Sequence, residues 1–256
     1  MGLAALKRFL LRSKLARRRI IIGLDFDGTL SPLASRPSLA RLPARTRHLL
    51  IELAPRLRVR LAIVSGRSLR DVRLRARLTG VYYAGNHGLE IQGPGLSWRH
   101  PQAERFPPII RKAARRLKEE LRGFSGILLE DKGLALSVHY RQVDPIHLPA
   151  IRRILKRFLR PHAGSLKLFF AKKTWEIRPV IDWDKGHALR KIAGLDRTKG
   201  TILFAGDDKT DERGFRTLGH GAITIRVGGA RSTGARFRLK DALQVQSLLK
   251  LLRDGA

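Results

Sequence analysis

Three short apolar runs, each followed directly by polar side chains, constrain this chain more than any other feature. The run 20–24 is followed by Asp25 and Asp27, the run 61–64 by Ser65, and the run 201–206 by Asp207 and Asp208. Continuous apolar runs of this length are typical of strands buried on both faces of a parallel sheet. Because ligands bind at the carboxyl ends of such strands, we expect these polar groups to meet at one site.

Helical patterns alternate with these strands, at residues 44–53, from Ser68 onward and at residues 184–194. Between about residues 108 and 178 the order changes to helix, strand, strand, helix, strand, strand, which indicates a small α/β insertion. Glycines and prolines just before this segment mark the passage into it. We therefore predict a catalytic core of residues 20–104 and 180–256 and a smaller α/β cap domain of residues 105–179.

The first 19 residues form a basic extension in which Leu3, Leu6, Phe9 and Leu10 lie near one face of a helix. Such a helix can lie on an anionic membrane surface, or it can be a leader helix or frayed end without a separate function. A long apolar centre and a small-residue cleavage site are missing from it, which argues against a secretory signal.

The charge balance is strongly basic, with 53 lysines and arginines against 21 aspartates and glutamates and a net charge of +32. Such a field attracts polyanions, including nucleic acid and small anionic substrates. The basic residues are spread along the whole chain, and only 6% of residues are aromatic, so the sequence offers no platform for stacking bases. We expect no specific nucleic-acid partner and only weak contact of the basic amino terminus with anionic surfaces.

The chain contains no cysteine, which excludes thiolate zinc sites and cysteine nucleophiles. It also lacks an apolar run of the roughly 20 residues needed to span a bilayer. We expect a cytoplasmic monomer that uses oxygen and nitrogen groups for its chemistry.

Five carboxylates lie within two short motifs: Asp25, Asp27, Asp207, Asp208 and Asp211. Carboxylates gathered this closely repel one another unless they are protonated or bound to a cation. Hard oxygen ligands suit Mg²⁺, which binds one or two carboxylates together with a substrate phosphate. The sequence therefore predicts a magnesium site.

A carboxylate beside Mg²⁺ can attack phosphorus and form an aspartyl phosphate, and Asp25 at the strand end is the better placed nucleophile. Asp27 would protonate the departing oxygen and later activate water. Gly28 would let the backbone approach the phosphate, while Ser65 and Lys185 would bind the phosphoryl oxygens. Each of these short motifs is common in ordinary loops, but their joint occurrence in this order makes a chance assembly improbable.

The order DFDGTL, VSGR, DKG and GDDKTDE resembles the haloacid dehalogenase superfamily of phosphatases, and within it the trehalose 6-phosphate phosphatases. The resemblance runs from about Ile20 to Leu252 and includes YYAGNHGLEI, LLEDKGLALSVHYR and WEIRPVIDWDKGHAL. It implies an α/β fold with a Rossmann-like core around a parallel sheet and a C2-type cap. It also implies Mg²⁺-dependent conversion of trehalose 6-phosphate to trehalose and phosphate in trehalose biosynthesis.

The resemblance further implies that Mg²⁺ is held by Asp25, the backbone carbonyl of Asp27 and Asp207, with Asp208 in support. One departure is Asn86, where many relatives carry an acidic residue. Cap residues that match the family's sugar-binding positions join the phosphate-binding loops in a predicted substrate site: Gly28, Arg67, Asn86, His87, Glu130, Lys132, Arg141 and Glu176.

Two alternatives remain open from the sequence. The same chemistry can act on sucrose 6-phosphate or another sugar phosphate, and the charged cap residues can be solvated salt bridges at strand ends. A basic protein that binds nucleic acid or membranes on a phosphatase scaffold is the other alternative. Its binding would weaken steeply with salt.

Overall fold

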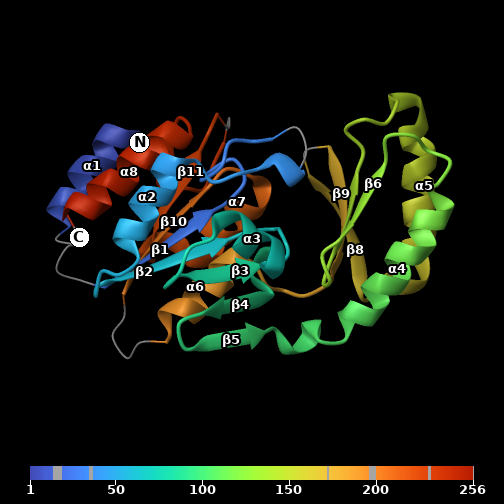
Figure 1. The fold of residues 1–256 in the computed structure, drawn as a ribbon, viewed down its shortest axis with the longest axis horizontal. Coiled ribbons are helices and arrows are strands. Elements are labelled where there is room, and N and C mark those ends of the chain that lie inside the picture. The colour runs from blue at the N-terminus through green and yellow to red at the C-terminus, as the bar shows by residue number, and fades with distance from the viewer. Residues whose placement is uncertain (14–18, 35–36, 172, 196–199, 230–231, 256) are drawn as a thin grey trace. The chain divides into compact units, whose positions relative to one another are not determined.

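The computed structural model describes residues 1–13, 19–34, 37–171, 173–195, 200–229 and 232–255. The chain divides into two compact units (Figure 1). The core unit comprises Met1–Trp98 and Trp183–Ala256, and the cap unit comprises Arg99–Asp182. The segment 105–179, for which we predicted a cap domain, lies inside the second unit.

The core unit is built on an eight-stranded sheet (Figure 1). All neighbours from β12 to β3 are parallel, and β4 is antiparallel to β3, which confirms the predicted α/β fold. The three apolar runs lie side by side, because β1 is between β10 and β2. Across the sheet the strands are β12 (Phe237–Leu239), β11 (Ile223–Val227), β10 (Thr201–Gly206), β1 (Ile20–Asp25), β2 (Val59–Val64), β3 (Tyr82–Gly85), β4 (Glu90–Gly93) and β5 (Leu96–Arg99).

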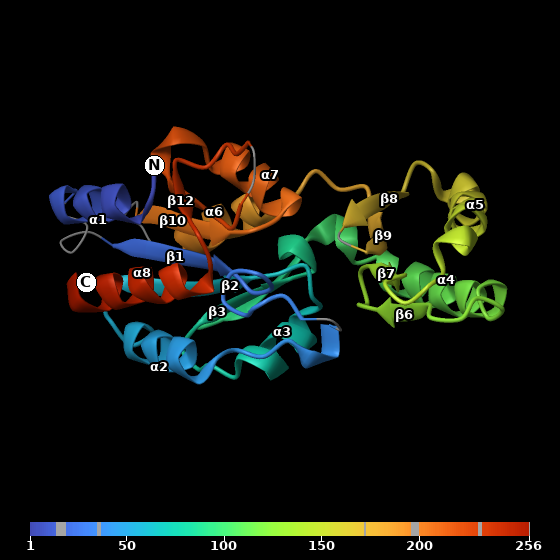
Figure 2. The same ribbon diagram turned by 90° about the horizontal axis from the view of Figure 1, so that it is seen from above.

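Helices cover both faces of this sheet, as expected for parallel strands that are apolar on both sides. On one face, α1 (Leu3–Arg12), α2 (Ala44–Leu53), α3 (Leu69–Ala76) and α8 (Ala242–Gly255) contribute to one apolar cluster. On the other, α6 (Lys185–Ala193) and α7 (Lys209–Leu218) contribute to a second cluster. Figure 2 shows α6 and α7 on the opposite side of the sheet from α2 and α3.

Strand β1 contributes side chains to the apolar clusters on both faces of the sheet. Ile22 and Leu24 pack in the first cluster and Ile21 in the second, because alternate side chains of a strand point to opposite faces. Gly23 leaves room for α6: a Cβ there would lie 2.5 Å from the Cδ2 atom of Leu189. The glycine therefore allows close packing of helix on strand.

The first helix is part of the core unit. Leu6 and Leu10 of α1 are buried, and the ring of Phe9 lies 5.4 Å from that of Phe237 in β12. The apolar face that the sequence offered to a membrane is thus packed against protein, which differs from the basic extension expected for residues 1–19. None of the helices in the described parts of the chain is long and apolar enough to cross a bilayer.

The cap unit contains a four-stranded antiparallel sheet in the order β6 (Leu128–Asp131), β7 (Leu136–His139), β9 (Thr174–Pro179) and β8 (Leu166–Ala171). Helices α4 (Phe106–Glu120) and α5 (Leu148–Leu159) lie along one face of it (Figure 2). The structure therefore has the predicted order of helix, strand, strand, helix, strand, strand.

Three strands were not anticipated, and the first of them, β4, follows a loop for which we expected only one short strand and a glycine-bracketed turn. Strand β5 lies in the segment read as glycine- and proline-rich punctuation, where Gly95 at φ +69° permits the turn from β4. Strand β12 has three residues, too few for a periodic pattern. Short 3-10 helices lie at Pro37–Leu39, Asn86–Gly88, Pro101–Ala103, Pro145–His147, Arg160–His162 and Gly219–Gly221.

Candidate active site

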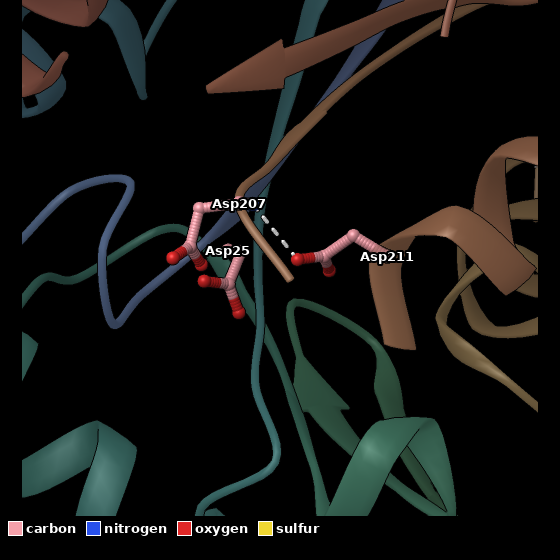
Figure 3. A group of neighbouring side chains, drawn as sticks. All are labelled: Asp25, Asp207 and Asp211. Atoms are coloured by element: carbon pink, nitrogen blue, oxygen red, sulfur yellow. Dashed lines mark hydrogen bonds between the residues drawn. The ribbon is translucent and has the colours of Figure 1, made fainter. Parts of the chain in front are cut away.

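The ends of β1, β2 and β10 bring their polar residues to one edge of the core sheet. Asp25 ends β1 and pairs with Val64, the residue before Ser65, while Asp207 follows directly after β10. One carboxylate oxygen each from Asp25, Asp207 and Asp211 lies within 4.8 Å of the others (Figure 3). The structure thus brings together groups that are separated by almost the whole length of the core.

Lys185 is the cation of this cluster. Its Nζ atom lies 2.7 Å from Oδ1 of Asp25 and 2.7 Å from Oδ1 of Asp211, and the side chain is only 2% exposed. Asp184 fixes the start of α6 by accepting hydrogen bonds from the backbone amides of Gly186 and His187. Burial lowers the pKa of Lys185, but the charges of Asp211 and Asp25 raise it well above its usual value. The amine therefore stays protonated.

One ammonium ion cannot neutralise all the carboxylates around it. Burial raises the pKa of Asp25 well above its usual value, and the charges of Asp207 and Asp208 add to the effect against the opposing charge of Lys185. Burial likewise raises the pKa of Asp207 to about 7, together with the charges of Asp211 and Asp208. The raised pKa values reflect negative charge that Lys185 alone does not offset, and a divalent cation would offset it, so the donor set fits Mg²⁺.

The amino terminus of α7 orders the loop that carries Asp207. Asp208 accepts hydrogen bonds at Oδ1 from the backbone amides of Thr210, at 2.7 Å, and Asp211, at 3.0 Å. Asp211 in turn accepts from the amides of Asp207 and Asp208, both at 2.9 Å, and one of these bonds is drawn in Figure 3. This reciprocal arrangement is a capping box.

Asp208, which we predicted to support the metal, thus uses one carboxylate oxygen to accept hydrogen bonds from the amino terminus of α7. Burial raises the pKa of Asp208, but Lys185 and the hydrogen bonds from Thr210 and Asp211 lower it far more. Asp211 belonged to the predicted acidic group but had no role assigned to it. Its spacing of three residues from Asp208, before a helix, was the signal for a capping box.

Gly28 lies directly against the carboxylate cluster. Its φ is +85°, and a Cβ atom there would lie 2.1 Å from Oδ2 of Asp207. Its amide donates to the carbonyl of Ser31 at 2.7 Å, which closes the turn after Asp27. Only glycine fits this turn, because both the backbone conformation and the space exclude a side chain.

Arg67 binds Asp27 through two parallel hydrogen bonds. Nε lies 2.6 Å from Oδ2 and Nη2 lies 2.6 Å from Oδ1, while Nη1 reaches Oδ2 of Asp71 at 2.6 Å. Arg75 also donates to Asp71, at 2.8 Å. Arg67 was predicted to contact substrate, and in this structure its buried guanidinium orients the carboxylate predicted to act as acid and base.

The loop after β3 is fastened to the segment after β2. The amide of Asn86 donates to the carbonyl of Arg67 at 2.7 Å, and that of His87 donates to the carbonyl of Ser65 at 2.9 Å. Asn86 and His87 have φ values of +49° and +59°, a conformation that is uncommon outside glycine. The Asn86 side chain donates to Glu90 at 2.9 Å. Ser65, Arg67, Asn86 and His87 therefore form one connected structure.

The cap unit gathers three of its four predicted substrate residues on one face of its sheet. Glu130 pairs with Ser137, which pairs with Glu176, so their side chains share a face. Lys132 donates to Oε1 of Glu176 at 2.7 Å, and Ser137 does so at 3.3 Å. Arg141 is exposed in the turn after β7.

His139 and Arg178 belong to the same face and were not predicted. His139 Nε2 lies 2.8 Å from Oε2 of Glu130, and Arg178 Nε lies 3.4 Å from Oε2 of Glu176. His139 lies two positions after Ser137 in β7, and Arg178 lies two positions after Glu176 in β9. The alternation of strand residues was therefore the signal that could have found them.

Known proteins match most of this chain. The family model described as trehalose-phosphatase matches residues 23–242. Trehalose-phosphate phosphatase B of Arabidopsis thaliana is 34% identical over 92% of this chain and 66% of its own length. Trehalose-phosphate phosphatase of Mycobacterium tuberculosis is 32% identical over 94% of this chain and 63% of its own length. The chain thus spans about two thirds of the length of these relatives.

Solved structures agree with the architecture. A trehalose-6-phosphate phosphatase related protein has a TM-score of 0.81 at 26% identity, covering 91% of this chain and 97% of its own. A haloacid dehalogenase-like hydrolase from Bacteroides thetaiotaomicron has a TM-score of 0.63 at 17% identity, covering 91% and 99%, and shows the fold alone. The chain thus shares the fold of that hydrolase. From the family match and these relatives, we conclude that the chain belongs to the trehalose-phosphatase family.

Proposed function

We propose that this chain hydrolyses trehalose 6-phosphate to trehalose and phosphate, as a step of trehalose biosynthesis. One observation carries the proposal: Asp25 ends β1 with its carboxylate between Lys185 and Asp207, beside a turn that only Gly28 can form. A nucleophilic carboxylate, a cation for the phosphoryl oxygens and a backbone that approaches closely are what phosphoryl transfer to an aspartate requires.

In the proposed mechanism, an oxygen of Asp25 attacks phosphorus while the bond from phosphorus to the sugar oxygen breaks. Asp27 gives its proton to that leaving oxygen, so trehalose departs as a neutral alcohol. Asp27 then takes a proton from water, which attacks the aspartyl phosphate and releases inorganic phosphate and the Asp25 carboxylate. Arg67 orients Asp27 in both steps, and Lys185 offsets charge at the phosphoryl group.

Mg²⁺ would be held by the carboxylates of Asp25 and Asp207 and the backbone carbonyl of Asp27, with Asp208 in support. When bound, it would neutralise charge on the phosphoryl group during transfer. The raised pKa values of Asp25 and Asp207 support this assignment, because they reflect negative charge that the chain alone leaves uncompensated.

Recognition of the sugar is proposed for the cap residues Glu130, Lys132, Arg141 and Glu176. Carboxylates and an ammonium suit the hydroxyl groups of a disaccharide, and the pair of Lys132 and Glu176 is largely buried. Gly28, Ser65, Asn86 and His87 are the proposed phosphate-side contacts. A monomeric state and a cytoplasmic location remain predictions.

The test is phosphate release from trehalose, sucrose, glucose and mannose 6-phosphates, with and without Mg²⁺, for the wild type and Asp25→Asn. Metal-dependent release that favours trehalose 6-phosphate and is lost in Asp25→Asn supports the proposal. Equal release from every sugar phosphate would overturn the substrate, and activity that survives Asp25→Asn would overturn the mechanism.

A further inference from the structure

The helical layer of the cap unit carries a concentrated positive charge. Helix α4 contains five basic residues and two glutamates, and α5 contains four basic residues and no acidic one. The two helices contact each other on the same face of the cap sheet. Their basic residues therefore form one cationic surface, whose field attracts anions.

A cavity of about 480 Å³ opens where α5 meets this sheet. Its volume lies within the range of roughly 300–1,000 Å³ that is usual for small-molecule sites. Arg152, Arg153 and Lys156 supply its charged lining, while Trp175 and the apolar residues of segment 145–149 (Pro145, Leu148 and Pro149) supply its apolar lining. No acidic residue is among the described residues that line it.

This cavity lies on the opposite side of the cap sheet from the proposed sugar contacts. Trp175 immediately precedes Glu176 in β9, so the two side chains point to opposite faces. Arg152 of α5 lies over the ring of Phe170, the strand partner of Trp175, at 5.3 Å from its centroid. The cavity is therefore distinct from the face that carries Glu130, Lys132 and Glu176.

We propose that this cavity is a second binding site, for an organic polyanion with a planar body, of the chemical class of a nucleoside triphosphate. Arg152 and Lys156 are four residues apart on α5 and so project from the same side of the helix, with Arg153 beside them. Guanidinium groups bind phosphate oxygens in pairs, and an ammonium adds a mobile point charge.

The apolar lining of the cavity determines which kind of group the ligand carries beside its phosphates. Trp175 is almost fully buried, and its ring is held by Tyr140, whose centroid lies 4.3 Å away. The exposed Pro145 and Pro149, together with the small part of the Trp175 ring that reaches the cavity, form an apolar wall against which a planar group packs. Inorganic phosphate or pyrophosphate would satisfy the cations but leave this lining unused, so the site selects for the planar body.

The test uses the full chain in EDTA and follows tryptophan fluorescence during titration with ATP and, separately, with pyrophosphate. We expect ATP to change the fluorescence and to bind at least tenfold more tightly than pyrophosphate. Trp175→Phe should remove the fluorescence change, since the other tryptophans, Trp98 and Trp183, lie in the core unit. Equal binding of ATP and pyrophosphate would overturn the planar part of the proposal.

Charge variants locate the site. Arg152→Ser/Arg153→Ser/Lys156→Ser should weaken ATP binding, followed by calorimetry, at least tenfold. The matched control, Arg111→Ser/Lys112→Ser/Arg115→Ser, removes the same charge from exposed positions of α4 that do not line the cavity, and it should change binding less than threefold. An equal loss of ATP affinity in both variants would show that binding depends on net charge alone, and it would overturn the proposed site.

A third variant separates this site from the carboxylate cluster of the core. Asp25→Asn should leave ATP binding within twofold of the wild type, because the cavity is formed by cap residues alone. If Asp25→Asn alters ATP binding as strongly as the triple substitution on α5, the ligand occupies the core site and the proposal fails. The outcome does not depend on phosphatase activity.

Discussion

Arg67 holds both carboxylate oxygens of Asp27, each at 2.6 Å, and a third bond at 2.6 Å ties the same guanidinium to Asp71. The geometry is that of a fork on a planar carboxylate, which lysine cannot reproduce with a single ammonium. Asp27 is therefore held in one orientation by a residue that is itself held in place.

Substituting Arg67 should reduce turnover through misorientation of Asp27. We expect Arg67→Lys to lower kcat about 10- to 100-fold, since a displacement of about 1 Å at a reacting group has effects of this size. Steady-state kinetics with trehalose 6-phosphate measures it. Arg75→Met, which removes the other partner of Asp71 but touches no atom of Asp27 in the structure, should lower kcat less than fivefold. A kcat for Arg67→Lys within twofold of the wild type would contradict this role.

Removing the buried ammonium should destabilise the fold. Lys185→Met leaves Asp25 and Asp211 without their shared cation, and breaking a buried ion pair on one side costs about 3–5 kcal/mol. Urea unfolding without Mg²⁺ measures the loss. Lys209→Met removes an exposed amine from the first turn of α7 and should change the free energy of unfolding by less than about 0.5 kcal/mol. Equal stability of the two variants would refute the prediction.

The metal-free protein should lose stability as the pH rises. Asp207 has a pKa of about 7 in the folded state against 3.8 in the unfolded chain, so the folded state binds its proton more tightly between these values. The stabilisation is complete below pH 4 and is lost as the pH passes 7. The free energy of unfolding of Asp207→Asn should therefore rise relative to that of the wild type as the pH increases, by up to about 4 kcal/mol at pH 8. Urea unfolding in EDTA at several pH values tests this, and a constant difference would contradict it.

Magnesium should reverse that loss. A ligand that binds only the folded state at 100 times its dissociation constant adds about 2.7 kcal/mol. At pH 8 we expect Mg²⁺ to raise the Tm of the wild type, and to have little effect on Asp207→Asn, which lacks one of the proposed ligands. Differential scanning calorimetry measures the Tm, and a parallel sample with NaCl at the same ionic strength separates a specific site from general ionic strength. An equal rise in both proteins would place Mg²⁺ elsewhere.

Gly28→Ala should collide with the carboxylate cluster. The new Cβ would lie 2.1 Å from Oδ2 of Asp207, and the residue would also be held at φ +85°. We expect activity to fall more than about 100-fold, because Asp207 must move. Gly80→Ala is the matched control: its φ is +71°, but no atom would lie within 4 Å of the new Cβ, so it reports the backbone strain alone. Equal effects of both substitutions on activity would count against the collision.

Local patterns predicted most of the core. Continuous apolar runs located β1, β2 and β10, Gly194 marked the end of α6, and the three strand ends met as parallel pairing requires. Contacts between distant residues could not be predicted in this way. Arg67 meets Asp27 across 40 positions and Lys132 meets Glu176 across 44, and no pattern within a single element encodes such a pair.

The amino-terminal helix shows the same limit. Its leucines and arginines describe an amphipathic helix equally well on a membrane or on protein. The deciding information was the apolar surface offered by α8 and β12, more than 200 positions away in the sequence. The apolar face of α1 could therefore be predicted from the sequence, whereas the elements against which it packs could not.

Lys185 ties chemistry to folding in a way that Asp27 does not. The ammonium joins the end of β1 to the start of α6 and to the first turn of α7, so its loss removes the charge proposed for catalysis and a structural bond together. Natural variation at Lys185 should therefore be purged by misfolding before any deficit in turnover is felt. Asp27 is about one third exposed, so its loss should affect the chemistry without destabilising the fold to the same extent. An inactive but well-folded descendant of this enzyme would therefore arise more readily by losing Asp27 than by losing Lys185.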